Sequence, residues 1–124
     1  MTVSIQIRGI NSATQFINSA SKKSHDAANK AIIKSGFFIE GEVKQSIAGH
    51  RAEHKSVDTG RFLNSVKNVQ NKPLTSTIES NVEYAKHLEY GTSRMKPRRH
   101  FNNTAKRNEK KVRTFVENEI KKAT

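Results

Sequence analysis

The sequence predicts an α+β fold in which a small antiparallel sheet packs against a long central helix and a C-terminal helix. Apolar and polar residues alternate at 3–7 and at 74–82, which is the period of a half-buried strand. From about 24 to 47, and again from 101 to 120, apolar residues recur every three or four positions, which is the period of an amphipathic helix. Strands and helices in this uneven order are typical of α+β domains.

The first third of the chain is expected to hold one strand and two helices. Gly9 ends the strand, and a capping box at 12–15 begins a short helix that reaches Ala20. The long helix follows and ends near 47 or 49. Its Gly36 and Gly41 each cost about 1 kcal/mol relative to Ala, so they predict close packing or a local bend.

The middle of the chain is expected to form a loop and a pair of strands. The stretch near 48–57 is polar and dense in charge, which predicts a flexible loop. A helical turn is predicted from 61, running into a strand that ends near 69. A turn at 71–73 then leads into the strand 74–82.

Two further helices complete the prediction. A short helix at 84–90 ends at Gly91, and Pro97 is expected in the first turn of the last helix, where its missing N–H would be unpaired anyway. One face of that helix is apolar from Phe101 to Ile120, with Phe115 included. Because no repeat or linker divides the chain, residues 1–124 are expected to form a single domain.

Composition limits the partners more than it limits the fold. There are 23 Lys and Arg against 11 Asp and Glu, giving a net charge of +12, which favours polyanions such as nucleic acid or an acidic protein surface. Only 33% of residues are hydrophobic, which predicts a thin core and surfaces that neighbouring subunits cover. The absence of cysteine excludes disulfides and thiolate metal sites. The most apolar stretch, 31–39, is too short to span a bilayer, and we expect a cytoplasmic site of assembly with no membrane partner.

One motif matches a catalytic pattern. His50, Glu53 and His54 follow the H-x-x-E-H spacing of inverted zinc peptidases, in which two histidines bind zinc and the glutamate is the base. That chemistry needs a stable helix and an apolar shell, whereas these residues lie in a hydrophilic stretch. No nucleophile elbow and no phosphate loop is present. We therefore expect no enzyme activity, no metal site and no cofactor.

Basic residues gather in the C-terminal third of the chain. They predict contacts with DNA phosphates along the last helix, although a solvated helix face explains them equally well. No recognition helix, zinc finger or base-stacking pair accompanies them, so sequence-specific reading of DNA is not expected. The predicted phosphate-contacting residues are Arg98, Arg99, Lys106, Arg107, Lys110 and Lys111.

Two short motifs carry more information. The first is a turn, Asp58-Thr59-Gly60, followed by an amphipathic segment that contains Leu63 and Ser65. The second follows a strand with a short helix and a sharp stop, and contains Tyr84, Ala85, Glu89, Tyr90, Gly91 and Thr92. Both motifs can simply mark turns between elements of the fold, because Gly60 and Gly91 permit backbone angles that other residues resist.

Taken together, these motifs resemble the head–tail joining, or tail-completion, family of lambda-like long-tailed phages. That family has an Asp-Thr-Gly turn followed by Leu and Ser, then a Tyr-Ala segment leading to a Glu-aromatic-Gly-Thr element. A Met, a Pro-containing turn and a Phe then open the last helix, as Met95, Pro97 and Phe101 do here. The resemblance covers roughly residues 25–120. One departure is His100, which stands where the family often has Pro.

The resemblance implies a structural virion protein of the phage neck. Such a protein joins the head connector to the tail tube or tail terminator by packing in a ring, six-fold by expectation, around the DNA channel. It also implies structural or interface roles for Tyr84, Glu89, Tyr90, Gly91 and Thr92. We further expect that the loop at 48–57 becomes ordered only on assembly. The alternative hypothesis, from charge alone, is a nonspecific DNA-binding protein involved in phage DNA packaging.

Overall fold

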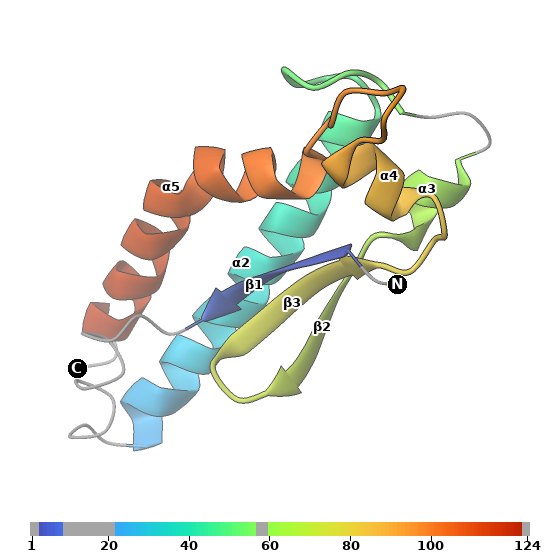
Figure 1. Cartoon of the computed structure of the whole chain (residues 1–124). Helices are drawn as coiled ribbons and strands as arrows, with labels where there is room; N and C mark the ends of the chain where they lie inside the picture. Colours follow the sequence, from blue (N-terminus) through green and yellow to red (C-terminus); the bar gives the residue numbers. More distant parts are fainter. Residues whose placement is uncertain (1–2, 9–21, 57–59, 123–124) are drawn as a thin grey trace.

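The computed structural model describes residues 3–8, 22–56 and 60–122, and these form a three-stranded antiparallel sheet packed with helices (Figure 1). The predicted α+β fold is therefore confirmed. The predicted helix at 13–20, together with Asp58 and Thr59, lies outside the described residues. The elements in chain order are β1 (Val3–Arg8), α2 (Lys22–Ile47), α3 (Arg61–Ser65), β2 (Lys67–Lys72), β3 (Thr75–Ser80), α4 (Ala85–Tyr90) and α5 (His100–Lys122).

The sheet has the order β1-β3-β2, so the strand with the clearest alternation lies in the centre. Ile78 of β3 pairs with Ile5 of β1 on one side and with Asn68 of β2 on the other. These residues share the face that packs on α2. The opposite face carries polar residues such as Ser4 and Glu79, as expected for a sheet with one side in solvent.

Helix α2 is the centre of the fold, because it packs against the sheet and against α5 (Figure 1). Its C-terminal half joins one core cluster, which includes Ile39, Val43 and Ile47 together with Phe62, Ile78 and Phe101 from other elements. Its N-terminal half packs Ala28, Ala31 and Ile32 against Val116 and Ile120 near the end of α5. Helices α2 and α5 therefore run antiparallel.

The two helical glycines behave differently. A Cβ at Gly36 would lie 2.5 Å from the side-chain amide of Asn68, so this glycine lets β2 approach α2 closely. A Cβ at Gly41 would meet nothing within 4 Å. Close packing is thus confirmed at Gly36, whereas no such contact explains Gly41.

Two local predictions were wrong. The hairpin turn lies at Pro73 and Leu74 rather than at 71–73, since β2 continues to Lys72 and Leu74 takes the positive φ of 60° that the turn requires. Pro97 does not begin the last helix, which starts at His100. The backbone N–H of Arg98 donates to Leu88 O at 2.8 Å, which ties this segment to α4 and delays the helix.

Candidate functional site

Glu89 is a capping residue supplied to α5 by another helix. Its carboxylate accepts hydrogen bonds from the backbone N–H groups of Phe101 and Asn102, each at 2.9 Å. The residue is only 3% exposed. Burial raises the pKa of Glu89, and the two backbone hydrogen bonds and the charge of Arg99 act against that rise. A carboxylate in this place satisfies N–H groups that a helix leaves without partners at its N-terminus.

Gly91 and Thr92 build the turn that returns the chain from α4 to α5. Gly91 has a φ of 77°, and a Cβ there would lie 2.7 Å from Pro97 N. The backbones of Thr92 and Met95 bond to each other across the turn, and Thr92 Oγ1 accepts from Arg94 N at 3.2 Å. These two predicted residues therefore shape the backbone around Glu89.

In the first motif, the residues that the structure describes, from Gly60 onward, also have structural roles. Gly60, with a φ of 82°, precedes α3. Ser65 Oγ donates to Phe62 O and lies 2.6 Å from Ser80 Oγ, which ties α3 to the end of β3. Leu63 packs against the larger core cluster, as does the fully buried Phe101.

Exposed aromatic residues form two groups on different elements. Tyr90 of α4 is 60% exposed, and Tyr84, which immediately precedes α4, is partly exposed and forms a T-shaped contact with Phe62. The other group, which we call the phenylalanine patch, consists of Phe37 and Phe38 of α2 and Phe115 of α5. Phe38 and Phe115 line a cavity of about 210 Å³ between the two helices.

The phenylalanine patch was not predicted from the sequence, because Phe37 and Phe38 fall within the apolar stretch 31–39 and Phe115 falls on the apolar face of the last helix. Phe37 is 57% exposed. Two adjacent aromatic residues point about 100° apart on a helix, so the Phe37-Phe38 pair was a signal that one ring lies outside the buried stripe.

A polar cluster, also missed from sequence, joins the loop after α2 to the beginning of α5. Glu53 receives hydrogen bonds from Arg107, at 3.1 Å to each carboxylate oxygen, from Ser46 Oγ at 2.6 Å and from Asn103 at 3.2 Å. Its side chain is 3% exposed. Burial alone would raise the pKa of Glu53, but these hydrogen bonds outweigh it and lower the pKa to about 2.

His100 lies between two serine hydroxyls in this cluster. Its Nδ1 is 2.8 Å from Ser46 Oγ and its Nε2 is 2.7 Å from Ser56 Oγ. Because Ser46 donates its proton to the Glu53 carboxylate, it accepts from Nδ1–H, and Nε2 is left to accept from Ser56. Burial lowers the pKa of His100 to about 4, which agrees with a neutral ring. The ring packs edge-on against Phe62.

The zinc-peptidase motif is not assembled. The side chains of His50 and His54 are exposed, and the Glu53 carboxylate is taken by Arg107, Ser46 and Asn103. Within residues 3–8, 22–56 and 60–122, no three His, Asp or Glu side chains lie together in a way that would hold a metal ion.

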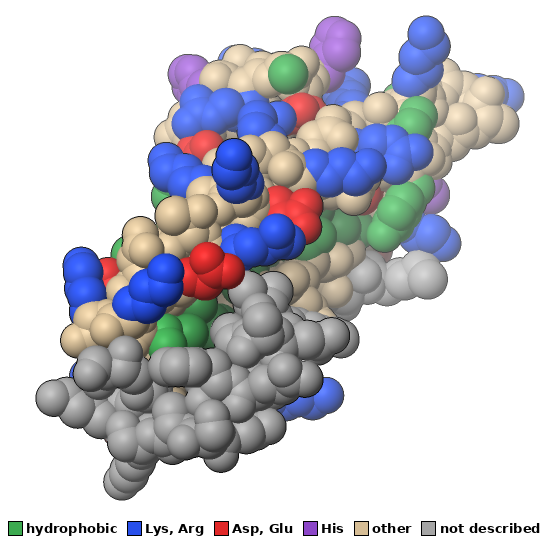
Figure 2. All heavy atoms as spheres, turned by 90° about the vertical axis from the view of Figure 1, so that its left-hand side faces the viewer, with side chains coloured by type: hydrophobic (Ala, Val, Ile, Leu, Met, Phe, Trp, Pro, Cys, Tyr) green, Lys and Arg blue, Asp and Glu red, His purple; other side chains and the backbone are tan. Residues whose placement is uncertain are grey.

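The predicted phosphate-contacting residues fall into two classes. Arg107 holds Glu53, Arg98 donates to Lys55 O and Ser56 Oγ, and the Lys111 ammonium lies 4.8 Å from the centre of the Phe38 ring. Arg99, Lys106 and Lys110 are exposed and extend toward solvent. Figure 2 shows this side of the molecule, where Lys and Arg side chains outnumber acidic ones.

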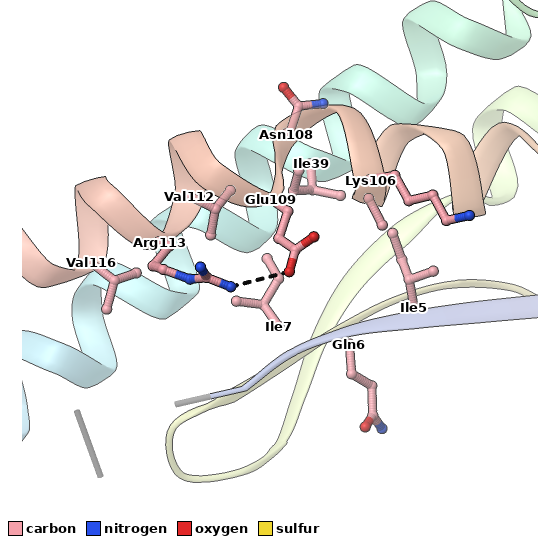
Figure 3. Close-up of a pocket in the computed structure, with 11 residues that line it drawn as sticks. Ile5, Gln6, Ile7, Ile39, Lys106, Asn108, Glu109, Val112, Arg113 and Val116 are labelled. Atoms are coloured by element: carbon pink, nitrogen blue, oxygen red, sulfur yellow. Dashed lines mark hydrogen bonds and ion pairs between the residues drawn. The ribbon is translucent and has the colours of Figure 1, made fainter. Parts of the chain in front are cut away.

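A shallow apolar cavity of about 310 Å³ lies between β1 and α5 (Figure 3). Ile5 and Ile7 point from β1 toward α5, which adds Val112 and Val116 to the lining, and an ion pair between Arg113 and Glu109 lies at its edge. The lining offers a hydrophobic contact surface and brings no nucleophile next to a base.

Comparison with known proteins identifies the family. The sequence model of the HK97-gp10-like family, described as "Bacteriophage HK97-gp10, putative tail-component", matches residues 11–91. The chain belongs to this family. No curated protein and no solved structure matches it.

Membership in the HK97-gp10-like family agrees with the resemblance to phage head–tail joining proteins and makes the chain a structural phage tail component located in the virion. The family is one of structural components, not of enzymes. The matched residues include the first short motif and the second as far as Gly91, and they stop before Thr92, Met95, Pro97, Phe101 and α5. None of the described helices is long and apolar enough to cross a membrane.

Proposed function

We propose that this protein joins the head connector to the tail in the phage neck, where copies pack in a six-fold ring around the DNA channel. The observation that carries the proposal is the family match over residues 11–91. Assembly takes place in the host cytoplasm, and the flanking partners are the connector, or head-completion protein, and the tail tube or terminator protein.

The exposed aromatic residues supply the contacts that a ring needs. A ring closes through heterologous contacts, in which one surface of a subunit meets a different surface of the next. The phenylalanine patch and the pair Tyr84 and Tyr90 are two such surfaces, since they lie on different elements. Aromatic residues are enriched in the centres of interfaces because they bury much area at little cost in side-chain entropy.

Gene deletion tests the function directly. We expect electron microscopy of a lysate lacking this gene to show filled heads and finished tails that lie separate. Infectivity should return when the wild-type gene is supplied from a plasmid. Intact virions would contradict the proposal, and empty heads would favour a role in DNA packaging.

Engineered disulfides test the ring contacts, because the natural chain has no cysteine. In particles carrying F37C and Y90C, oxidation should link successive subunits into ladders of covalent multimers. The matched control replaces F37C with K72C, an exposed residue at the hairpin end of β2 that belongs to neither aromatic group. Equal ladders in the two variants would refute the proposed pairing.

The alternative function, a nonspecific DNA-binding protein that acts in packaging, is favoured by one observation, the basic side of the molecule (Figure 2). The deletion phenotype separates the two functions, since loss of a packaging protein leaves heads empty and loss of a joining protein leaves them filled.

A further inference from the structure

The basic charge is concentrated in one segment. Residues 94–113 hold nine of the 23 Lys and Arg of the chain and one of its 11 acidic residues, Glu109. The segment comprises the turn before α5 and the first half of that helix. It lies wholly beyond the residues that match the family, so its charge needs an explanation of its own.

Part of this charge stabilises the fold. Arg107 is bound to Glu53, Arg98 to the loop at 55–56, and Lys111 lies over Phe38. Such residues would have to break existing contacts before they could bind another group. The remaining cations have no comparable anchor: Arg113 pairs with Glu109, but both side chains are about half exposed or more, and such pairs contribute little.

The remaining cations on α5 form a row. Lys106, Lys110 and Arg113 stand at positions i, i+4 and i+7, which places them within about 60° of one another around the helix. All three side chains are exposed, and Lys106 and Arg113 also line the cavity between β1 and α5. The row spans about 10 Å along the helix, a length over which a DNA strand presents several phosphates.

We infer that the row Lys106, Lys110 and Arg113 binds the phosphates of double-stranded DNA without regard to sequence. The three side chains of the row are cations, with Glu109 paired to Arg113 beside them, and contacts of cations with phosphates fix position but carry no sequence information. The biological setting rests on the proposed function, since a ring around the channel brings every subunit close to DNA. The binding itself is a property of the single chain and is measured without assembly.

The test compares two double variants with equal loss of charge. K106Q/K110Q removes two members of the row, and K67Q/K72Q removes two exposed lysines from β2, the strand at the sheet edge away from α5. Fluorescence anisotropy with two short duplexes of unrelated sequence, over a range of NaCl concentrations, measures the affinity and its dependence on salt.

We expect wild type and K67Q/K72Q to bind both duplexes with similar affinity. The slope of log K against log salt should fall by about 1.8 in K106Q/K110Q, which is about 0.9 for each lost phosphate contact. Circular dichroism confirms that both variants are folded. Absence of binding by wild type at low salt, or equal slopes in the two variants, would overturn the inference. Polyglutamate that competes as well as unlabelled DNA at equal charge would overturn it in favour of an acidic protein partner.

The outcome is independent of the deletion experiment. A wild-type chain that fails to bind DNA leaves the neck function standing, and a lysate with intact virions leaves the measured DNA binding standing.

Discussion

The carboxylate of Glu89 on α4 accepts a 2.9 Å hydrogen bond from the backbone N–H of Phe101, the second residue of α5. With the bond from Asn102 N, it fixes where α5 begins. Gly91 allows the chain to turn back so that this bond can form. The residues of the Glu-aromatic-Gly-Thr element are therefore divided between two roles, because Glu89, Gly91 and Thr92 shape the turn while Tyr90 remains exposed.

Removing this cap should destabilise the protein. We expect E89A to lower the free energy of unfolding by about 2–3 kcal/mol, because two backbone N–H groups lose a charged acceptor. Chemical denaturation monitored by circular dichroism measures the change. E83A, at an exposed glutamate just before α4, is the control and should change stability by less than about 0.5 kcal/mol. Equal effects would show that α5 does not depend on the cap.

The Glu53 cluster should make the fold sensitive to strong acid. The pKa of Glu53 is about 2 in the folded chain, below its ordinary value of 4.5, so its contribution is complete above pH 4.5 and is lost as the pH falls toward 2. E53Q should be less stable than wild type at pH 7, by about 1–2 kcal/mol, and the difference should shrink toward pH 2. A constant difference between pH 7 and pH 2 would contradict the role of the ionised carboxylate.

His100 should add a second acid-sensitive range. The pKa of His100 is about 4 in the folded chain, whereas its ordinary value is 6.5. As the pH falls from 6.5 to 4, His100 is therefore protonated in the unfolded chain but stays neutral in the folded chain, which favours unfolding. Stability should decline by up to about 3 kcal/mol over this range. H100Q should remove this part of the pH dependence, and H54Q, at an exposed histidine, should retain it. Denaturation curves of wild type and both variants at several pH values measure this pH dependence.

The two helical glycines should respond oppositely to substitution by alanine. G41A should stabilise the protein by about 0.5–1 kcal/mol, because alanine favours the helix and its Cβ meets nothing. G36A should destabilise it by about 1 kcal/mol, since Asn68 must move and give up its bond to Ile33 O.

The N68A background provides the control for the second substitution. There, G36A should become neutral or stabilising, because the clash is gone. A stabilising G36A in the wild-type chain would show that Asn68 moves aside without cost.

Hydrogen exchange tests the loop. Its ends are held by the bonds His50 N to Gln45 O and Ser56 N to Ile47 O, and its middle by the Glu53 side chain. The backbone N–H groups of residues 51–55 donate to no described residue. We expect these amides to exchange quickly in the isolated chain and to become protected on assembly. The amide of Ser56 should exchange slowly both in the isolated chain and in the assembly. Protection of 51–55 before assembly would contradict ordering on assembly.

Periodicity in the sequence was enough to predict the fold class and most elements. The strand at β3, the long helix α2 and the helix ending at Gly91 follow from local patterns, because each buries one face and that face repeats at the period of its own structure. The family motifs could be identified for a related reason. Gly60 and Gly91 occupy backbone angles that few other residues adopt, so their places in the sequence mark turns.

Only the tertiary structure decided which polar side chains form hydrogen bonds within the fold and which extend into solvent. The Glu53–Arg107 pair joins residues 54 positions apart, and Glu89 caps a helix that begins 11 residues later, distances at which no sequence period operates. For the same reason, neighbouring residues in the sequence could not predict that α5 begins at His100 or that Phe37 is exposed. Hydrogen bonds and packing between distant segments decide these features, because a side chain's burial and charge state depend on what the rest of the fold places beside it.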